Sequence, residues 1–148
     1  MRLQQVERKV PHYLFAKRIG ILFDATLPEN VVSVNRYAES LKRENKEVTL
    51  LGYIDAKKNF GQPAFNFISK KDVNWIFKPR DQKVMKFINE DFDVLVNAWF
   101  AEYYPLQFIS TLSKAGLRVG AFEEAKLDCF DLMLKIERPR DFDLYLDQ

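Results

Sequence analysis

The chain has little of the residue types that build metal and redox centres. Its 148 residues include one cysteine, Cys129, and one histidine, His12. A single cysteine excludes an internal disulfide, and one Cys with one His cannot build a zinc site of the usual kind. A Ser–His or Cys–His pair would have to bring His12 across the domain, because this residue precedes the first predicted strand. We therefore predict no metal, and we interpret Cys129 as a buried structural thiol.

Glycine is scarce, and no hydrophobic run is long. The five glycines form no G-x-G-x-x-G or G-K-[ST] after the first predicted strand, and the turn that follows it, "ATLPEN", has none. We therefore expect no typical dinucleotide or nucleoside triphosphate site and predict no cofactor. Apolar runs of about five to eight residues are far shorter than the roughly 20 that span a bilayer. The start, "MRLQQVERKV", lacks the apolar core of a secretory signal, so we expect a cytoplasmic protein without a membrane span.

The charge of the chain is divided between its two halves. The net charge of +2 conceals 15 Lys/Arg against 8 Asp/Glu in residues 1–80 (+7), and 8 against 13 in residues 81–148 (−5). The basic excess lies in Met1–Arg18, with five basic residues and one acid, and in Lys57–Arg80, with six and one. This separation favours an anionic partner, although it says nothing about the fold.

Short apolar runs alternate with helical periodicity along most of the chain. Continuous apolar stretches predict strands over 18–25, 47–55, 93–99, 117–122 and 131–136, and 64–69 and 73–77 are compatible with further short strands. Apolar spacing predicts helices over 31–45, 82–90 and 105–115, and residues 138–148 look like the opening of a last helix. Strands that alternate with such helices indicate βαβ units.

The predicted fold is a three-layer α/β domain over residues 18–148, preceded by a basic N-terminal segment, 1–17. We expect a mainly parallel sheet of about five strands with helices on both faces, in a flavodoxin-like or Rossmann-like order. Two helix boundaries have sequence signals: Asn30 is the predicted N-cap of the first helix, and Gly116 is the predicted C-cap of the helix that begins near Pro105.

Four stretches together resemble a known group of sequences. "KRIGILFDAT", "KDVNWIFKPRD", "FDVLVNAW" and "AGLRVGAF" are similar to an uncharacterised family of small α/β proteins from Bacteroidota. The resemblance covers roughly Lys17 to Ile136. It implies a cytoplasmic bacterial protein, and it supplies no activity and no functional residues.

Polar residues follow several of the predicted strands: Asp24 and Thr26, Asp55, Asn97, and Glu123 with Glu124. Ligands of such sheets bind outside the carboxyl ends of the strands. If the protein is an enzyme, the candidate catalytic residues are Asp24, Asn97 and Glu123, in a small hydrolase or transferase that acts on an anionic substrate. The alternative is that short polar residues end the strands and hold the next turn. "DAT" also lacks the two aspartates of phosphoryl-transfer hydrolases, so we favour a protein that is not an enzyme.

The stretch 57–80 combines positive charge with aromatic rings. Its basic residues are Lys57, Lys58, Lys70, Lys71, Lys78 and Arg80, and its aromatic residues are Phe60, Phe65, Phe67, Trp75 and Phe77. Basic side chains contact phosphates, and aromatic faces stack on unpaired bases. The alternative is that the rings belong to half-buried strands and the lysines to solvated turns. The predicted function is a binding module whose basic face contacts RNA, a ribonucleoprotein or an acidic protein through Lys57, Lys58, Lys70, Lys71, Trp75, Lys78 and Arg80.

Overall fold

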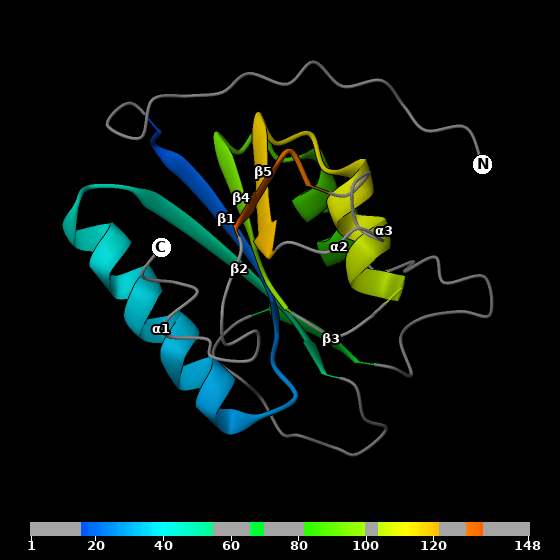
Figure 1. Ribbon diagram of the computed structural model, residues 1–148, viewed down its shortest axis with the longest axis horizontal. Helices are drawn as coiled ribbons and strands as arrows, with labels where there is room; N and C mark the ends of the chain where they lie inside the picture. Colours follow the sequence, from blue (N-terminus) through cyan, green and yellow to red (C-terminus); the bar gives the residue numbers. More distant parts are fainter. Residues whose placement is uncertain (1–15, 55–65, 70–81, 100–103, 122–129, 135–148) are drawn as a thin grey trace.

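The protein is an open parallel sheet with helices on both faces (Figure 1). The computed structural model describes residues 16–54, 66–69, 82–99, 104–121 and 130–134. Its strands are β1 (Arg18–Asp24), β2 (Glu47–Ile54), β3 (Asn66–Ser69), β4 (Val94–Ala98), β5 (Leu117–Ala121) and β6 (Leu132–Leu134), and its helices are α1 (Pro28–Arg43), α2 (Gln82–Asn89) and α3 (Tyr104–Leu112). The strand order is β3-β2-β1-β4-β5-β6, with every neighbouring pair parallel.

The predicted three-layer α/β fold with a mainly parallel sheet is confirmed. The sheet has six strands, and the sixth is the possible short strand over 64–69, of which Asn66–Ser69 pair with β2 at the edge. The predicted strand over 73–77 and the last helix over 138–148 lie outside the described residues, as do His12 and Cys129.

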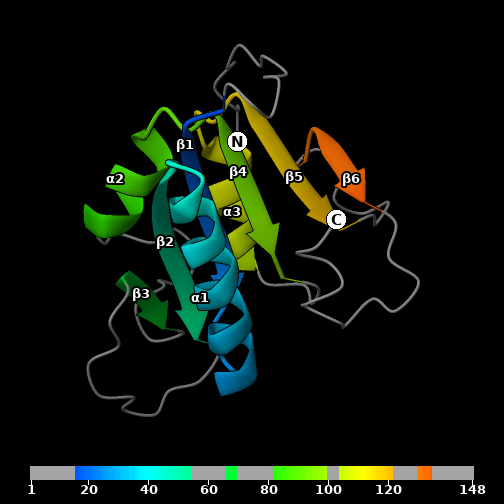
Figure 2. The same cartoon turned by 90° about the vertical axis from the view of Figure 1, so that its left-hand side faces the viewer.

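The strand order explains on which face each helix lies. The chain runs from β1 to β2 on one side of the sheet and from β4 to β5 on the other side. Right-handed crossovers in opposite directions place their helices on opposite faces. Accordingly α1 covers one face, and α2 and α3 cover the other (Figure 2). The direction reverses between β1 and β4, and this is the order of doubly wound Rossmann-like sheets.

Helix α1 begins earlier than its capping signal predicts. It starts at Pro28, and Leu27 is the N-cap residue with no side-chain cap hydrogen bond. Proline is preorganised for the first helical position, where its missing N–H costs nothing. The prediction that Asn30 is the N-cap is therefore wrong, and Asn30 lies inside the first turn.

The end of α1 is closed by an asparagine in the left-handed conformation. Asn45 has a φ of 64°, its N–H donates to the Lys42 carbonyl oxygen at 3.0 Å, and the Lys46 N–H donates to the Leu41 carbonyl oxygen at 3.2 Å. These are the two hydrogen bonds of a Schellman motif, which satisfies carbonyl groups that the helix leaves open. The motif turns the chain directly into β2.

Two apolar clusters fill the spaces between the sheet and its helices. On the α1 side, Ile21, Phe23 and Val34 are buried. On the other side, Trp99 and Ile109 belong to a cluster that also contains the apolar stripe of α2: Val84, Phe87 and Ile88. Alternate residues of each strand enter opposite clusters, as the period of two requires.

Helix α3 ends earlier than predicted because the Lys114 N–H, which would continue the helix, donates to the Ile88 carbonyl oxygen at 3.0 Å instead. Arg118 Nη1 donates to the carbonyl oxygens of Ser110 at 3.3 Å and Thr111 at 3.4 Å. A guanidinium there satisfies open acceptors and complements the negative end of the helix. The helix stops at Leu112, and the Gly116 N–H donates to the Phe92 carbonyl oxygen at 2.9 Å. The prediction that Gly116 is the C-cap is wrong.

A pair of hydrogen bonds fixes the register between β1 and β4. The Arg18 N–H donates to Asp93 Oδ2 at 2.9 Å, and the Asp93 N–H donates to the Arg18 carbonyl oxygen at 2.8 Å. The ring of Phe92 lies over Gly20, where an added Cβ would come within 2.6 Å of it. We call this arrangement of Arg18, Gly20, Phe92 and Asp93 a register clamp.

A second register clamp joins β5 to β6. The Arg118 N–H donates to Asp131 Oδ2 at 2.8 Å, and the Asp131 N–H donates to the Arg118 carbonyl oxygen at 2.8 Å. The ring of Phe130 lies over Gly120, where a Cβ would come within 2.3 Å of it. The clamps share one pattern in the sequence, R-I-G or R-V-G in one strand and F-D before the neighbouring strand.

Candidate functional site

The structure brings two of the three candidate catalytic residues to the same edge of the sheet. Leu22 of β1 pairs with Asn97 of β4, and Asp24 lies two residues farther along β1, on the same face. Both side chains therefore belong to the carboxyl edge, beside the reversal point between β1 and β4 where ligands bind in such sheets. Glu123, the third candidate, lies outside the described residues, as do Asp55 and Glu124.

Asp24 organises the turn that joins β1 to α1. Its Oδ1 accepts a hydrogen bond from the Thr26 N–H at 2.9 Å, and the Ala25 N–H donates to the Tyr53 carbonyl oxygen at 2.8 Å. A carboxylate that bonds the backbone two residues on forms an Asx-turn, which is a frequent role of aspartate at a strand end. This contact supports the structural interpretation of Asp24.

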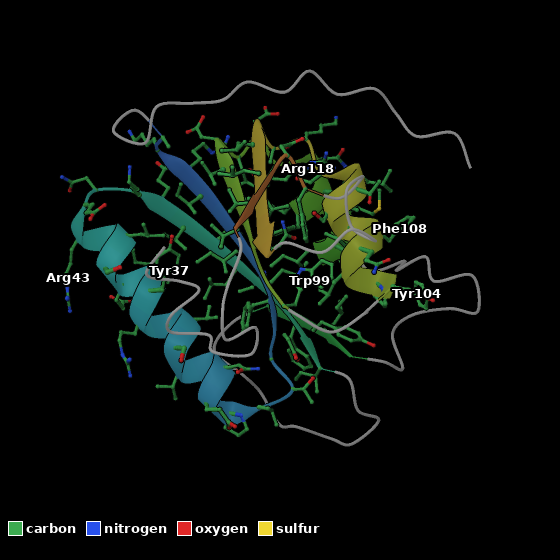
Figure 3. The ribbon with its side chains drawn as sticks, viewed as in Figure 1. Tyr37, Arg43, Trp99, Tyr104, Phe108 and Arg118 are labelled. Atoms are coloured by element: carbon green, nitrogen blue, oxygen red, sulfur yellow. The ribbon has the colours of Figure 1, made fainter. Side chains whose placement is uncertain are left out.

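Asn97 is fully buried and uses both ends of its amide. Its Nδ2 donates to the Val119 carbonyl oxygen at 3.0 Å, which ties β4 to β5. Its Oδ1 accepts from Trp99 Nε1 at 3.2 Å. Trp99, labelled in Figure 3, is also fully buried, on the side of the sheet that α3 covers, and its ring meets Phe130 edge-on at 5.5 Å between centroids. These contacts give the Asn97 amide a structural role.

One signal for this role was present in the sequence and was missed. In "DVLVNAW" the Asn and the Trp are two positions apart, so in a strand they point to the same face. A buried indole N–H needs an acceptor, and the amide two residues away supplies it. The bond from Asn97 to Val119 joins residues far apart along the chain and has no such local signal.

The start of α1 is poorly suited to an anion. Pro28 has no N–H to donate, and the Asn30 N–H already donates to the Leu27 carbonyl oxygen at 3.1 Å. The exposed carboxylate of Glu29 stands in the first turn, where it would repel a phosphate. Phosphate sites at helix N-termini depend on free amides and a positive field, and this turn offers neither the full set of amides nor the field.

The predicted polyanion-binding residues lie outside the described ranges: Lys57, Lys58, Lys70, Lys71, Trp75, Lys78 and Arg80. Of the five aromatic residues in that stretch, the structure describes Phe67. It is half-buried in β3 and packs against the cluster on the α1 side, so the core interpretation is confirmed for this ring.

No metal site marks the carboxyl edge of the sheet in the described ranges. Among those residues, no three His, Cys, Asp or Glu side chains gather in a way that could hold a metal ion. A perturbed group lies elsewhere: burial raises the pKa of the Tyr37 phenol on α1, and the nearby carboxylate of Glu44 raises this pKa further. Tyr37 packs against the α1-side cluster, so packing accounts for its shift.

Fold and strand order together define a doubly wound α/β protein with an acidic turn, not a glycine-rich one, after β1. The chain belongs to a family of unknown function, DUF6913, which matches residues 2–148. No curated protein and no solved structure matches it. Within the described residues, none of the helices is long and apolar enough to cross a membrane.

Proposed function

We propose that this protein is a binding module for an anionic partner, and that the partner is single-stranded RNA. The observation that carries the proposal is the pairing of Ile54 with Ser69, the last residues of β2 and β3. Lys57 and Lys58 follow Ile54 by three and four residues, and Lys70 and Lys71 follow Ser69 directly. Ile54 and Ser69 lie side by side at the carboxyl edge, where parallel sheets bind ligands, and a pair of lysines follows each of them in the sequence.

Four of the described acidic residues lie away from this edge. Glu47, Glu90, Asp93 and Asp131 lie at or before the amino ends of β2, β4 and β6. Three of them are held by partners there: Glu90 pairs with Arg18, Asp93 accepts from the β1 backbone, and Asp131 pairs with Arg118 at 3.0 Å. These four acidic groups therefore lie at the opposite end of the strands from Ile54 and Ser69, whereas Asp24 ends β1 at the carboxyl edge.

RNA is preferred over an acidic protein because of the aromatic rings in the same stretch. Phe60, Trp75 and Phe77 alternate with the basic residues of 57–80, and stacking on rings is the sequence-tolerant way in which proteins hold unpaired bases. We further propose, from the sequence resemblance, that the protein acts in the bacterial cytoplasm. Fractionation of the source cells tests this location, and recovery in the membrane or periplasmic fraction would contradict it.

Salt dependence of binding to a labelled oligouridylate tests the proposal. Each phosphate contact contributes about 0.7 to the slope of log K against log salt for a single strand. Lys70→Ala/Lys71→Ala is therefore expected to lower the slope by about 1.4. The matched control is Lys42→Ala/Arg43→Ala, two adjacent basic residues in the last turn of α1, where Figure 3 shows Arg43 pointing away from the sheet.

The control variant is expected to bind as the wild type does. If both double variants lower the salt slope of RNA binding equally, the effect is one of overall charge, and the proposed basic face is contradicted. Polyglutamate is the competing probe. If polyglutamate binds with an affinity that falls as salt rises and oligouridylate does not bind, the partner is an acidic protein and the RNA proposal fails.

Trp75→Ala separates a stacking ring from a core ring. A stacking role predicts unchanged stability and RNA binding weaker by about 1–3 kcal/mol. A core role predicts a loss of about 3–5 kcal/mol in the free energy of unfolding. Urea denaturation and fluorescence anisotropy on the same variant measure the two quantities.

A further inference from the structure

A polar pocket of about 370 Å³ lies between α2 and the β2–β3 side of the sheet. Its volume is near the lower end of the range for small-ligand sites, about 300–1,000 Å³. Leu51 and Phe87 are its apolar residues on the α2 side of the sheet. Five polar side chains surround them: Thr49, Asn66, Gln82, Lys86 and Glu90.

Two polar side chains of α2 and the one that directly follows the helix line this pocket. Gln82, Lys86 and Glu90 are four residues apart, and residues at this spacing share a helix face. In the sequence this polar stripe is the complement of the apolar stripe of α2, whose spacing predicts a helix but no ligand.

The unbalanced charge of the pocket is positive. Glu90 is neutralised by its ion pair with Arg18, which also approaches Glu47 at 3.9 Å. Among the residues that the structure describes, no carboxylate pairs with the Lys86 ammonium. The pocket thus presents one available cation to a ligand, beside a carboxylate that is held in place.

The remaining polar groups suit a flat ligand with donors and acceptors on its edge. Asn66 and Gln82 each carry an amide with a donor and an acceptor, the pattern that proteins use to read base edges. Thr49 adds a hydroxyl, and Lys86 is placed to meet a phosphate. We propose that this pocket binds one nucleotide, with its base between the two amides and its phosphate at Lys86.

The nucleotide has two sources, a free ribonucleotide or one unit of an RNA chain. Asn66 begins β3 and Gln82 begins α2, and the basic residues of 57–80 precede one or both of them in the sequence, so the pocket residues are close to this stretch along the chain. Binding of a free nucleotide does not require those basic residues, because every group named for the pocket belongs to β2, β3 or α2 or follows α2 directly. The two proposals can therefore fail separately.

The test uses the full chain, the four ribonucleoside 5′-monophosphates and ribose 5-phosphate, with affinities from amide chemical-shift titration. At least one nucleotide is expected to bind and to shift amides of β3 and α2. Lys86→Ala is expected to weaken it about tenfold, the loss of a charge-assisted contact at an exposed site. Gln82→Ala is expected to change the preference among bases. The matched controls on α1, Lys42→Ala and Asn35→Ala, are expected to leave affinity unchanged.

Several results would overturn the proposal. The first is that no nucleotide binds at about 10 mM. The second is that ribose 5-phosphate binds as tightly as the nucleotides, and the third is that Lys42→Ala weakens nucleotide binding as much as Lys86→Ala does. Loss of nucleotide binding in Lys70→Ala/Lys71→Ala would place the ligand at the basic residues of 57–80 instead. If Lys86→Ala weakens the binding of both the free nucleotide and oligouridylate, the pocket binds one unit of an RNA chain. If it weakens only the binding of the free nucleotide, the ligand is a free ribonucleotide.

Discussion

Replacing Asn97 by leucine tests whether this residue is structural. Leucine has the same number of side-chain heavy atoms, branched at the same position, so the change removes the polar contacts without leaving a cavity. Trp99 Nε1 loses its acceptor in a fully buried setting, and the Val119 carbonyl oxygen loses a donor in a partly buried one. A buried group left without its partner costs about 1–3 kcal/mol, and the second group costs less because it is less buried.

The two losses together predict a decrease of about 2–4 kcal/mol in the free energy of unfolding. For a chain of this length, a loss of about 3 kcal/mol corresponds to a Tm lower by about 6–12 °C. Urea denaturation followed by circular dichroism measures the loss. An Asn97→Leu variant within about 0.5 kcal/mol of the wild type would refute the structural role.

Asn97→Asp gives an independent test through pH. A protonated carboxyl can donate to Val119 and accept from Trp99, as the amide does, whereas an ionised one is buried and faces a carbonyl oxygen. Burial favours the neutral form and raises the pKa of this introduced carboxyl above its value in the unfolded chain. The stability deficit of the variant is therefore small below about pH 4 and grows as the pH rises. A deficit that stays constant from about pH 4 to pH 8 would contradict the reasoning.

Three further changes are measured by the same unfolding assay. Gly20→Ala places a Cβ 2.6 Å from the ring of Phe92 and is expected to cost about 1–3 kcal/mol, with partial recovery in combination with Phe92→Leu; additive losses would contradict the contact. Arg118→Met leaves a carboxylate without its cation and is expected to cost about 2–4 kcal/mol, less than a fully buried pair because the carboxylate is partly exposed; a neutral result would refute the role of the pair. The pKa of Tyr37 is raised above 10.0, so the stability that its proton contributes is complete below about pH 10 and is lost as the pH rises through the folded-state pKa. Tyr37→Phe is expected to lose less stability than the wild type over that interval, and the exposed Tyr104→Phe is the control; equal behaviour of the two variants would contradict the shift.

Much of the architecture could be predicted from local pattern, because apolar period and helix spacing are local properties. The strands around Ile21, Leu51 and Leu95 were predicted from continuous apolar runs, since strands covered on both faces have no polar alternation. The ends of helices were less predictable. Asn30 is a good capping residue in isolation, but Pro28 starts the helix first. Gly116 is a good C-cap, but α3 ends at Leu112 because the Lys114 N–H donates to the Ile88 carbonyl oxygen.

The sequence predicts where the candidate site residues lie better than it predicts what they do. Strand alternation was enough to bring Asp24 and Asn97 to one edge, since parallel strands end together. Their hydrogen bonds depend on which neighbours face them. Asn97 contacts Val119, 22 residues away, and no local pattern predicts that contact. The groups of the pocket beside α2 come from three elements, and only the period of Gln82 and Lys86 is visible in one helix.

The two register clamps make a statement about sequences other than this one. The ring of Phe92 fills the space that a side chain at position 20 would need. A relative with a larger residue than glycine at position 20 should therefore carry a smaller residue than phenylalanine at position 92. The same exchange is expected between Gly120 and Phe130, independently of the first pair. One clamp joins strands that are distant in the sequence, and the other joins successive strands. Paired changes at these positions would therefore give two independent reference points for aligning divergent members of the family.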